Sequence, residues 1–208
     1  MDLLVLAKEP IAGLVKTRLC PPCSPSEAAA IAEAALADTL HAAVASGADR
    51  VVVSLDGRPG AWCPAGVEVV DQGQGTLSDR LAATWRSTRG PALQIGMDTP
   101  QADASILAAA MAQLVDGPDT AVLGQAVDGG WWAVGMLEPH PEVFAGVPTS
   151  QTDTGRRQLS RLVESGLATG VLPRLRDVDA WADAVAVAAL CPGSRFGSAV
   201  RRVSETAA

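Results

Sequence analysis

The chain has 208 residues, a formal net charge of −7, and a composition that is 48% hydrophobic and 19% charged. These values are typical of one globular domain, with an expected core of about residues 2–190 and a tail from 192 whose order the sequence leaves open. The acidic balance disfavours a protein that coats nucleic acid. A phosphate-bearing ligand would therefore need a local basic site.

No basic leader precedes the first apolar segment, and we expect no apolar run long enough to span a membrane. These features favour a cytoplasmic protein. Four cysteines at this length give no disulfide framework. Cys20 and Cys23 have redox or zinc spacing, but a structural zinc site needs two further ligands, for which no second motif exists. A thiol oxidoreductase is therefore a less favoured alternative.

The first nineteen residues combine a short strand with a basic loop. Residues 2–7 are largely apolar and predict a buried strand, and the loop after it contains both lysines of the chain. Such a loop can hold phosphate, because glycine lets backbone N–H groups approach and cations neutralise charge. It is not a Walker loop, since no glycine stands next to Lys16. The expected nucleotide contacts here are Ala7, Lys8, Gly13, Lys16 and Arg18.

Strands and helices alternate along the rest of the chain. Ser24-Pro25-Ser26-Glu27 has the pattern of a capping box with proline at the first helical position, and Gly47 is a natural stop. Apolar runs between turns predict strands at 50–55, 67–70, 91–96, 120–123, 131–137 and 170–172. Helices are expected at 24–46, 76–88, 105–115, 141–145, 153–166 and 179–190. This alternation predicts an α/β fold with a mostly parallel sheet.

Several loops that follow expected strands contain candidate ligand-binding residues. In open α/β sheets, ligands bind beyond the carboxyl ends of the strands. The N-terminal loop, the turn at 73–76, Asp98 and Asp128 should therefore meet at one rim. The turn lacks a third glycine at the spacing of a dinucleotide fingerprint, but its backbone amides can face a base or ribose. The expected nucleotide contacts in this turn are Gln72, Gly73, Gly75 and Thr76.

Asp98 and Asp128 are the candidate metal ligands. Asp98 lies in Gly96-Met97-Asp98-Thr99-Pro100, where a strand-end carboxylate can hold Mg²⁺ together with substrate phosphates. The alternative is an aspartate that caps its own turn. Asp128 precedes two glycines, which on turn chemistry alone predicts a hairpin. Its functional interpretation is a second metal ligand or a contact with the transferred group.

Several stretches together resemble a bacterial family of uncharacterised GT-A-like transferases, often labelled glycosyltransferase-like or radical-SAM/selenodomain-associated. Their order and spacing agree over about residues 3–183. More distantly, the chain is similar to guanylyltransferases that act on molybdopterin or phospholactate. The stretches are Ala7-Lys8-Glu9-Pro10, Gly13-Leu14-Val15-Lys16-Thr17-Arg18-Leu19, Gln72-Gly73-Gln74-Gly75-Thr76-Leu77-Ser78-Asp79-Arg80-Leu81, Ile95-Gly96-Met97-Asp98-Thr99-Pro100, Asp128-Gly129-Gly130-Trp131-Trp132-Ala133-Val134-Gly135 and Asp177-Val178-Asp179.

The resemblance implies a nucleotide-diphospho-sugar transferase fold, a three-layer α/β/α sandwich with a mixed, mostly parallel sheet. It implies that the N-terminal loop wraps the nucleotide phosphates and that the Asp98 position holds Mg²⁺ or Mn²⁺. Members of the family often differ from this chain at Met97 and in the segment 148–153. These two places are therefore expected to shape the acceptor pocket.

We accordingly expect a metal-dependent transferase that uses an NTP or a nucleotide-diphospho-sugar and a small-molecule acceptor. Nucleotidyl and glycosyl transfer both need cations on a diphosphate leaving group, and Lys16 and Arg18 are the candidates. Asp128 is the third candidate catalytic residue. In glycosyl transfer either Asp128 or Asp153 could serve as the base. The alternative is a nucleotide-binding module without catalysis.

Overall fold

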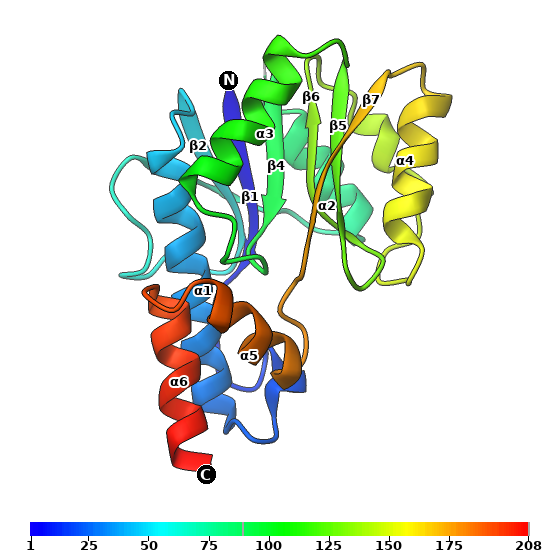
Figure 1. The fold of residues 1–208 in the computed structure, drawn as a ribbon. Coiled ribbons are helices and arrows are strands. Elements are labelled where there is room, and N and C mark those ends of the chain that lie inside the picture. Colours follow the sequence, from blue (N-terminus) through cyan, green and yellow to red (C-terminus); the bar gives the residue numbers. More distant parts are fainter. Residues whose placement is uncertain (89, 208) are drawn as a thin grey trace.

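The computed structural model describes residues 1–88 and 90–207, which form a seven-stranded sheet between two helical layers (Figure 1). The strand order is β3-β2-β1-β4-β6-β5-β7. Among the strands described, β6 alone runs antiparallel to its neighbours. This confirms the predicted mixed, mostly parallel α/β/α sandwich. The strands are β1 (Asp2–Lys8), β2 (Arg50–Asp56), β3 (Val67–Asp71), β4 (Ala92–Gly96), β5 (Ala121–Ala126), β6 (Trp131–Met136) and β7 (Thr169–Leu175).

Two apolar clusters hold the helices against the two faces of the sheet. One cluster joins the sheet to α1 (Pro25–Ala45) and α3 (Ala104–Asp116). The other joins it to α2 (Leu77–Trp85), the 3-10 helix η2 (Pro141–Phe144) and α4 (Thr154–Glu164). The central strands are covered on both sides, which explains why they are continuous apolar runs in the sequence.

Local sequence signals fix where the helices begin. The Ser24 side chain accepts from the Glu27 backbone N–H, and the Glu27 carboxylate accepts from the Ser24 N–H at 2.7 Å. Thr76 and Asp79 form the same reciprocal pair at the start of α2. Each box satisfies donors that the first helical turn would otherwise leave unpaired. Both helices therefore start where the sequence predicts.

Helix α1 corrects one expectation from the sequence. Its 21 residues are long and apolar enough, by length and composition alone, to cross a membrane. However, 56% of its apolar window is buried inside the structure. Packing against the sheet and against other helices therefore accounts for its apolar composition.

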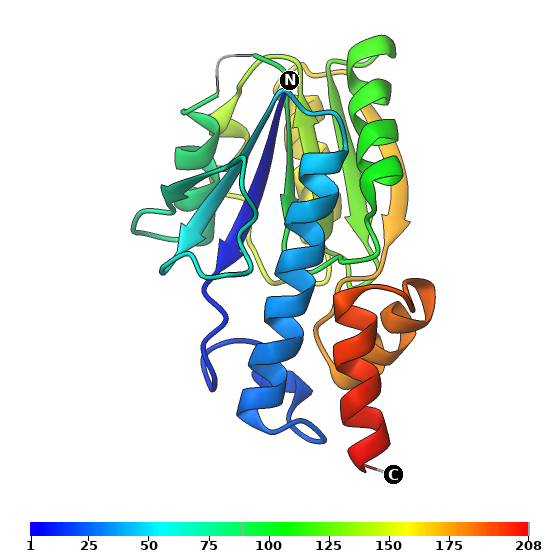
Figure 2. The ribbon, with the colours of Figure 1, turned by 90° about the vertical axis from the view of Figure 1, so that its left-hand side faces the viewer.

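A helical extension lies beyond the carboxyl ends of the strands. It consists of the first half of α1, the 3-10 helix η1 (Thr17–Leu19), α5 (Trp181–Leu190) and α6 (Arg195–Ala207), which share a third apolar cluster. Figure 2 shows α1 running along the sheet and continuing into this extension beside α6. The segment after Pro192, whose order the sequence left open, thus forms a helix. Leu19 and Val178 are buried in the same cluster.

Replacing Phe196 by Ala tests whether α6 belongs to the cooperative fold. Phe196 is fully buried in the cluster of the helical extension, so its truncation should lower the free energy of unfolding by about 3–5 kcal/mol. Urea denaturation followed by circular dichroism measures this change. Leu190→Ala is the matched control, because Leu190 is 69% exposed and should change stability by less than about 0.5 kcal/mol. Equal stability of the two variants would contradict the packing of α6.

Candidate active site at the carboxyl rim of the sheet

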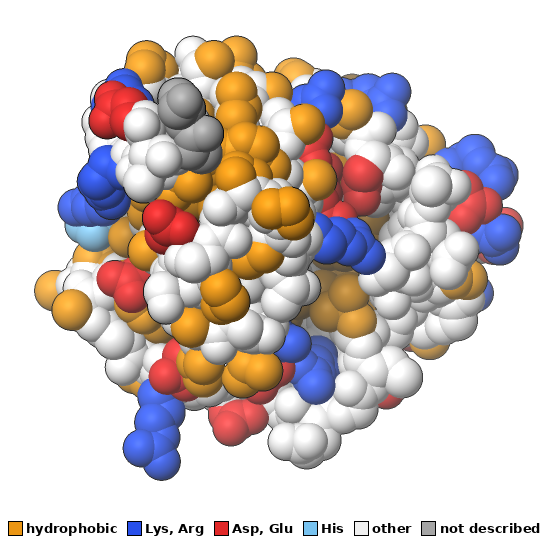
Figure 3. Space-filling model, turned by 90° about the horizontal axis from the view of Figure 1, so that it is seen from below, with side chains coloured by type: hydrophobic (Ala, Val, Ile, Leu, Met, Phe, Trp, Pro, Cys, Tyr) orange, Lys and Arg blue, Asp and Glu red, His pale blue; other side chains and the backbone are white. Residues whose placement is uncertain are grey.

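The strand directions bring the loops predicted to bind ligands to one rim. Strands β1, β2, β3, β4, β5 and β7 share a direction, so the N-terminal loop, the turn at 73–76, Asp98 and Asp128 all follow carboxyl ends at the same edge. The helical extension lies beside this edge. Seen from below, the molecule is hollowed there, with acidic and basic side chains around the hollow (Figure 3).

Lys16 contacts Asp98 directly. Its Nζ lies 2.6 Å from Asp98 Oδ1 and donates to the backbone oxygen of Val178 at 2.5 Å. Lys16 has a left-handed backbone conformation, with φ of 48°, and its side chain is 12% exposed. The sequence predicted a phosphate-binding cation and a metal-binding carboxylate. The structure brings these two side chains together as an ion pair.

The other two predicted phosphate-binding cations also have carboxylate partners. Arg18 forms an ion pair and hydrogen bond with Asp179, at the same side of the rim as Lys16. Lys8 lies toward β2, with its Nζ 3.8 Å from Asp56 Oδ2, and its side chain is 58% exposed. Arg18, at 75% exposed, and Lys8 are therefore both open to solvent, whereas Lys16 is nearly enclosed.

A network of hydrogen bonds made by Gln72 and Arg80 connects the glycine turn to β1 and β2. The buried Gln72 donates both amide hydrogens, to the carbonyl oxygens of Ala7 and Ser54. Its Oε1 accepts from Arg80 at 2.9 Å, and the same guanidinium contacts Asp56 and the Gly75 carbonyl. Gln72 therefore positions the turn and has no free amide hydrogen for a ligand.

Two further residues of the turn have local structural roles. Gly75 has a φ of +104°, and a Cβ there would lie 2.8 Å from the Asp79 carboxylate. Thr76 donates its hydroxyl to Asp79 at 2.6 Å as part of the capping box. The Gly73 N–H donates to Asp71 at 2.6 Å, and the N–H and hydroxyl of Thr76 are engaged by Asp79 in starting α2, so these groups already have partners within the turn.

Asp128 lies in the hairpin between β5 and β6, as turn chemistry predicts. Its Oδ1 accepts from the Gly130 N–H at 2.7 Å. Gly129 has a φ of +97°, and a Cβ there would lie 1.8 Å from the Thr152 carbonyl oxygen, so only glycine fits. The Gly129 carbonyl accepts from Gly155 at 2.8 Å. The hairpin is thus fixed against the start of α4. Asp128 stabilises the turn through its bond to Gly130 and also lies at the rim.

Asp153 is a poor candidate for the base. Its carboxylate lies 2.8 Å from Arg157 and 3.0 Å from Arg156. The hydrogen bond from Arg157 and the charges of both arginines lower the pKa of Asp153 below its usual value. A carboxylate stabilised in this way has little tendency to accept a proton.

Asp177 is a rim residue that was absent from the predicted site. Burial, followed by the negative charges of Asp128, Asp179 and Asp98, raises the pKa of Asp177 to about 6. Val178 N–H donates to the Asp98 carbonyl at 2.8 Å, so the Asp177 segment lies directly beside the end of β4. The sequence predicted that the strand before Asp177 ends at residue 172, whereas β7 continues to Leu175. Had the strand end been predicted correctly, the rule that ligands bind beyond the carboxyl ends of strands would have selected Asp177 as it selected Asp98.

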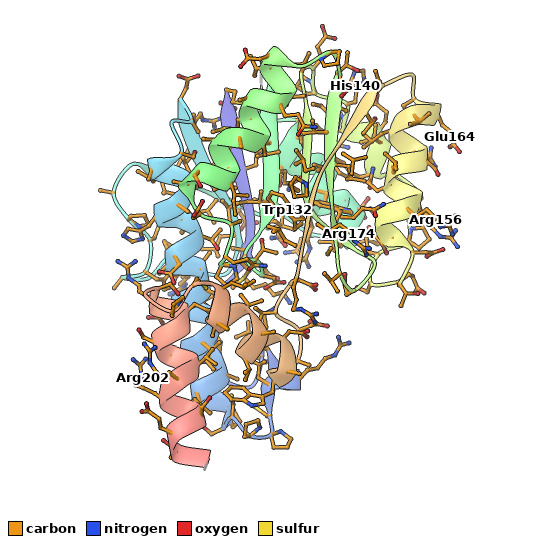
Figure 4. The ribbon with its side chains drawn as sticks, in the orientation of Figure 1. Trp132, His140, Arg156, Glu164, Arg174 and Arg202 are labelled. Atoms are coloured by element: carbon orange, nitrogen blue, oxygen red, sulfur yellow. The ribbon has the colours of Figure 1, made fainter. Side chains whose placement is uncertain are left out.

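Two side chains hold β7 in this position (Figure 4). Trp132, on β6, donates its indole N–H to the Pro173 carbonyl at 2.9 Å. Arg174 donates to the Ala126 carbonyl at 3.2 Å. Together with the β5–β7 pairing, these bonds determine where the chain leaves the sheet toward Asp177.

Cys23, one of the two cysteines in the C-x-x-C segment, lacks the lowered thiol pKa of a redox centre. All four cysteines are free thiols, and Cys23 is buried in the cluster of the helical extension. Burial, with added repulsion from Cys20 and Glu27, raises the pKa of the Cys23 thiol to about 11. Thiol chemistry proceeds through the thiolate, which is disfavoured here.

The sequence matches a family model described as "Uncharacterized protein conserved in bacteria (DUF2064)" over residues 30–151, more than half of the chain. The chain belongs to this family. The matched range contains the glycine turn, Asp98 and Asp128, while the N-terminal loop and Asp177 lie outside it. No curated protein matches the sequence.

Solved structures show that the fold is that of nucleotide-diphospho-sugar transferases. A Desulfovibrio desulfuricans G20 protein, provisionally named as such a transferase, is 20% identical with a TM-score of 0.87, covering 99% of this chain and 96% of that one. A CMP:2-keto-3-deoxy-manno-octonic acid synthetase complexed with CTP is 12% identical (TM-score 0.55; coverage 91% and 98%). A manganese complex of a Mycobacterium tuberculosis H37Rv protein is 19% identical (TM-score 0.51; coverage 89% and 96%). These likenesses confirm the expected fold.

Replacing Arg80 by Met tests the network below the glycine turn. The substitution leaves the buried Gln72 Oε1 without its donor, so we expect the free energy of unfolding to fall by about 1–3 kcal/mol. Urea denaturation measures the loss. Arg86→Met is the control, because Arg86 is an exposed arginine at the end of the same helix. If both variants were equally stable, the network would not support the turn.

Proposed function

We propose that this protein is a metal-dependent transferase that uses an NTP or a nucleotide-diphospho-sugar and a small-molecule acceptor. The observation that carries the proposal is the meeting of Lys16 and Arg18 with Asp98 and Asp177 at one rim. Cations there suit a diphosphate, and carboxylates suit a divalent metal ion. The rim of an α/β sheet is also where such ligands bind.

The two versions of the reaction need the same parts of the protein. In nucleotidyl transfer, an acceptor phosphate oxygen attacks the α-phosphorus of an NTP and pyrophosphate leaves. In glycosyl transfer, an acceptor hydroxyl attacks the anomeric carbon, loses its proton to a base, and the nucleoside diphosphate leaves. Lys16 and Arg18 stabilise the charge of either leaving group. Asp128 is the better base candidate, because Asp153 is held by two arginines.

The donor set fits a magnesium or manganese ion. Among the residues described, no three His, Cys, Asp or Glu side chains are close enough to hold a metal by themselves. Mg²⁺ typically takes one or two carboxylates and completes its shell with water and substrate phosphates. Asp98 and the neighbouring Asp177 would hold the ion, with Asp128 as a further candidate. A bound ion would neutralise charge on the phosphate oxygens.

We assign the nucleotide and the acceptor to two neighbouring places. The loops after β1 and β3 would receive the nucleotide, with backbone groups near Gly13 and in the turn at 73–76 as the contacts. Ala7 lies inside β1, and its carbonyl is already bonded to Gln72. A hollow of about 700 Å³ runs along α2, from Thr76 to Arg86, between this helix and the segment 141–149. It includes Thr76 and Pro148, and its size suits a small acceptor.

The comparisons support the proposal at the level of the fold. One similar structure is complexed with CTP and another with manganese. A nucleotide-binding module that has lost catalysis would share these features. Release of pyrophosphate or nucleoside diphosphate in the presence of an acceptor separates the enzyme from such a module.

A thermal-unfolding panel of NTPs and nucleotide sugars, each with and without Mg²⁺ or Mn²⁺, tests nucleotide binding. A ligand at one hundred times its Kd stabilises the folded protein by roughly 2.7 kcal/mol. For a domain of this size we expect Tm to rise by about 5–10 °C, and only when metal is present. The proposal fails if no nucleotide gives a metal-dependent shift.

Asp98→Asn and Asp177→Asn test the metal ligands. Each variant loses one charged oxygen donor, so the affinity for the nucleotide with metal should fall about tenfold or more, as measured by calorimetry. Asp116→Asn is the control, because Asp116 is exposed at the end of α3, away from the rim. Unchanged affinity in Asp98→Asn would remove Asp98 from the metal site.

A further inference from the structure

The proposed function gives Lys16 and Asp98 separate ligands, a phosphate group and a metal ion, yet in the structure they bind each other. Lys16 Nζ lies 2.6 Å from Asp98 Oδ1. The ammonium thus occupies one oxygen of the carboxylate that a divalent ion would need. The further inference rests on the proposed function and concerns what this contact does before a substrate arrives.

The Lys16 contact differs from an ordinary surface ion pair. The lysine side chain is 12% exposed, and the Val178 carbonyl accepts a second hydrogen bond at 2.5 Å. The loop that carries it is anchored through Leu19 and Cys23, both buried in the cluster of the helical extension. In contrast, Lys8 in the same loop is 58% exposed and lies 3.8 Å from its partner. The ammonium of Lys16 is therefore held at Asp98 by its surroundings.

Asp98 remains accessible to solvent despite this contact. Its side chain is 45% exposed, so a metal ion can approach it from solvent. An ion that binds there must either displace the ammonium or share the carboxylate with a like charge. Both alternatives weaken metal binding, because like charges a few ångströms apart repel strongly where solvent is partly excluded. The nearly enclosed Lys16 meets that condition.

A diphosphate group changes the competition between the Lys16 ammonium and a metal ion for Asp98. It offers Lys16 several negatively charged oxygens in place of one carboxylate and one carbonyl, and charge-assisted bonds to phosphate are strong. An ammonium drawn to phosphate leaves Asp98 free, and phosphate oxygens supply further metal ligands. The two ligands therefore assist each other.

We propose that Lys16 is an internal cation that occupies Asp98 in the ligand-free protein and makes divalent-metal binding depend on a diphosphate. Metal affinity is low until a diphosphate-bearing ligand binds, and it then rises. By linkage, the metal raises the affinity for that ligand by the same factor. The protein thus avoids holding a metal ion at the rim without its substrate.

Manganese binding to the whole protein tests this proposal, with bound Mn²⁺ measured by electron paramagnetic resonance. Lys16→Met removes the charge but keeps the length of the side chain, and should bind Mn²⁺ at least about tenfold more tightly than the wild type, or about 1.4 kcal/mol. Lys16→Arg keeps a cation and should bind as weakly as the wild type. Lys8→Met removes the same charge from the same loop and should leave the Mn²⁺ affinity of the ligand-free protein unchanged.

Inorganic pyrophosphate is the probe for the second arm, because both candidate leaving groups contain a diphosphate. After correction for its complex with Mn²⁺ in protein-free solution, it should increase the Mn²⁺ retained by the wild type much more than that retained by Lys16→Met. Thermal unfolding verifies that each variant is folded. The wild-type measurement is independent of any variant, and a wild type that binds Mn²⁺ equally well without pyrophosphate overturns the proposal even if Lys16→Met does not fold.

The outcomes separate this inference from the proposed function. Equal Mn²⁺ affinity in the wild type and Lys16→Met, or a wild type that binds Mn²⁺ equally well without pyrophosphate, overturns the role of Lys16 and leaves the transferase standing. If no variant retains Mn²⁺ under any condition, the metal site of the proposed function fails too.

Discussion

The contact among Lys16, Asp98 and Val178 joins the three parts of the molecule that form the rim. Lys16 comes from the N-terminal loop, Asp98 from the end of β4, and Val178 from the segment after β7. Each part is held independently, the loop and Val178 by the cluster of the helical extension and Asp98 by the sheet. The ammonium compensates the negative charge of Asp98 at the point where the three parts meet.

The helical extension gives the rim its second wall. A sheet with helices on both faces would leave the N-terminal loop without support, since residues beyond β1 have no neighbouring strand. The packing of α5 and α6 against the first half of α1 provides a small core into which Leu19, Cys23 and Val178 are inserted. The length of α1 is what connects this core to the sheet, so an apolar helix of 21 residues is explained by two separate packing tasks.

Most of the secondary structure could be predicted because its signals are local. The capping boxes at Ser24 and Thr76, the apolar strands and the Asp-Gly hairpin depend on residues close in sequence. The class of fold followed from their alternation, and the shared rim followed from strand direction. The end of β7 could not be predicted, because it depends on pairing with β5 and on bonds from Trp132 and Arg174, all distant in sequence.

The sequence by itself determined the α/β architecture, the basic loop and the acidic strand ends, because propensity and spacing suffice for these. Only the tertiary structure decided how they meet. It brought Lys16 onto Asp98, Lys8 to Asp56, and Asp177 beside both Asp98 and Asp128. It also engaged Gln72 below the turn and Asp153 with two arginines. Partners of charged and polar side chains depend on distances across the fold, and spacing along the chain does not contain them.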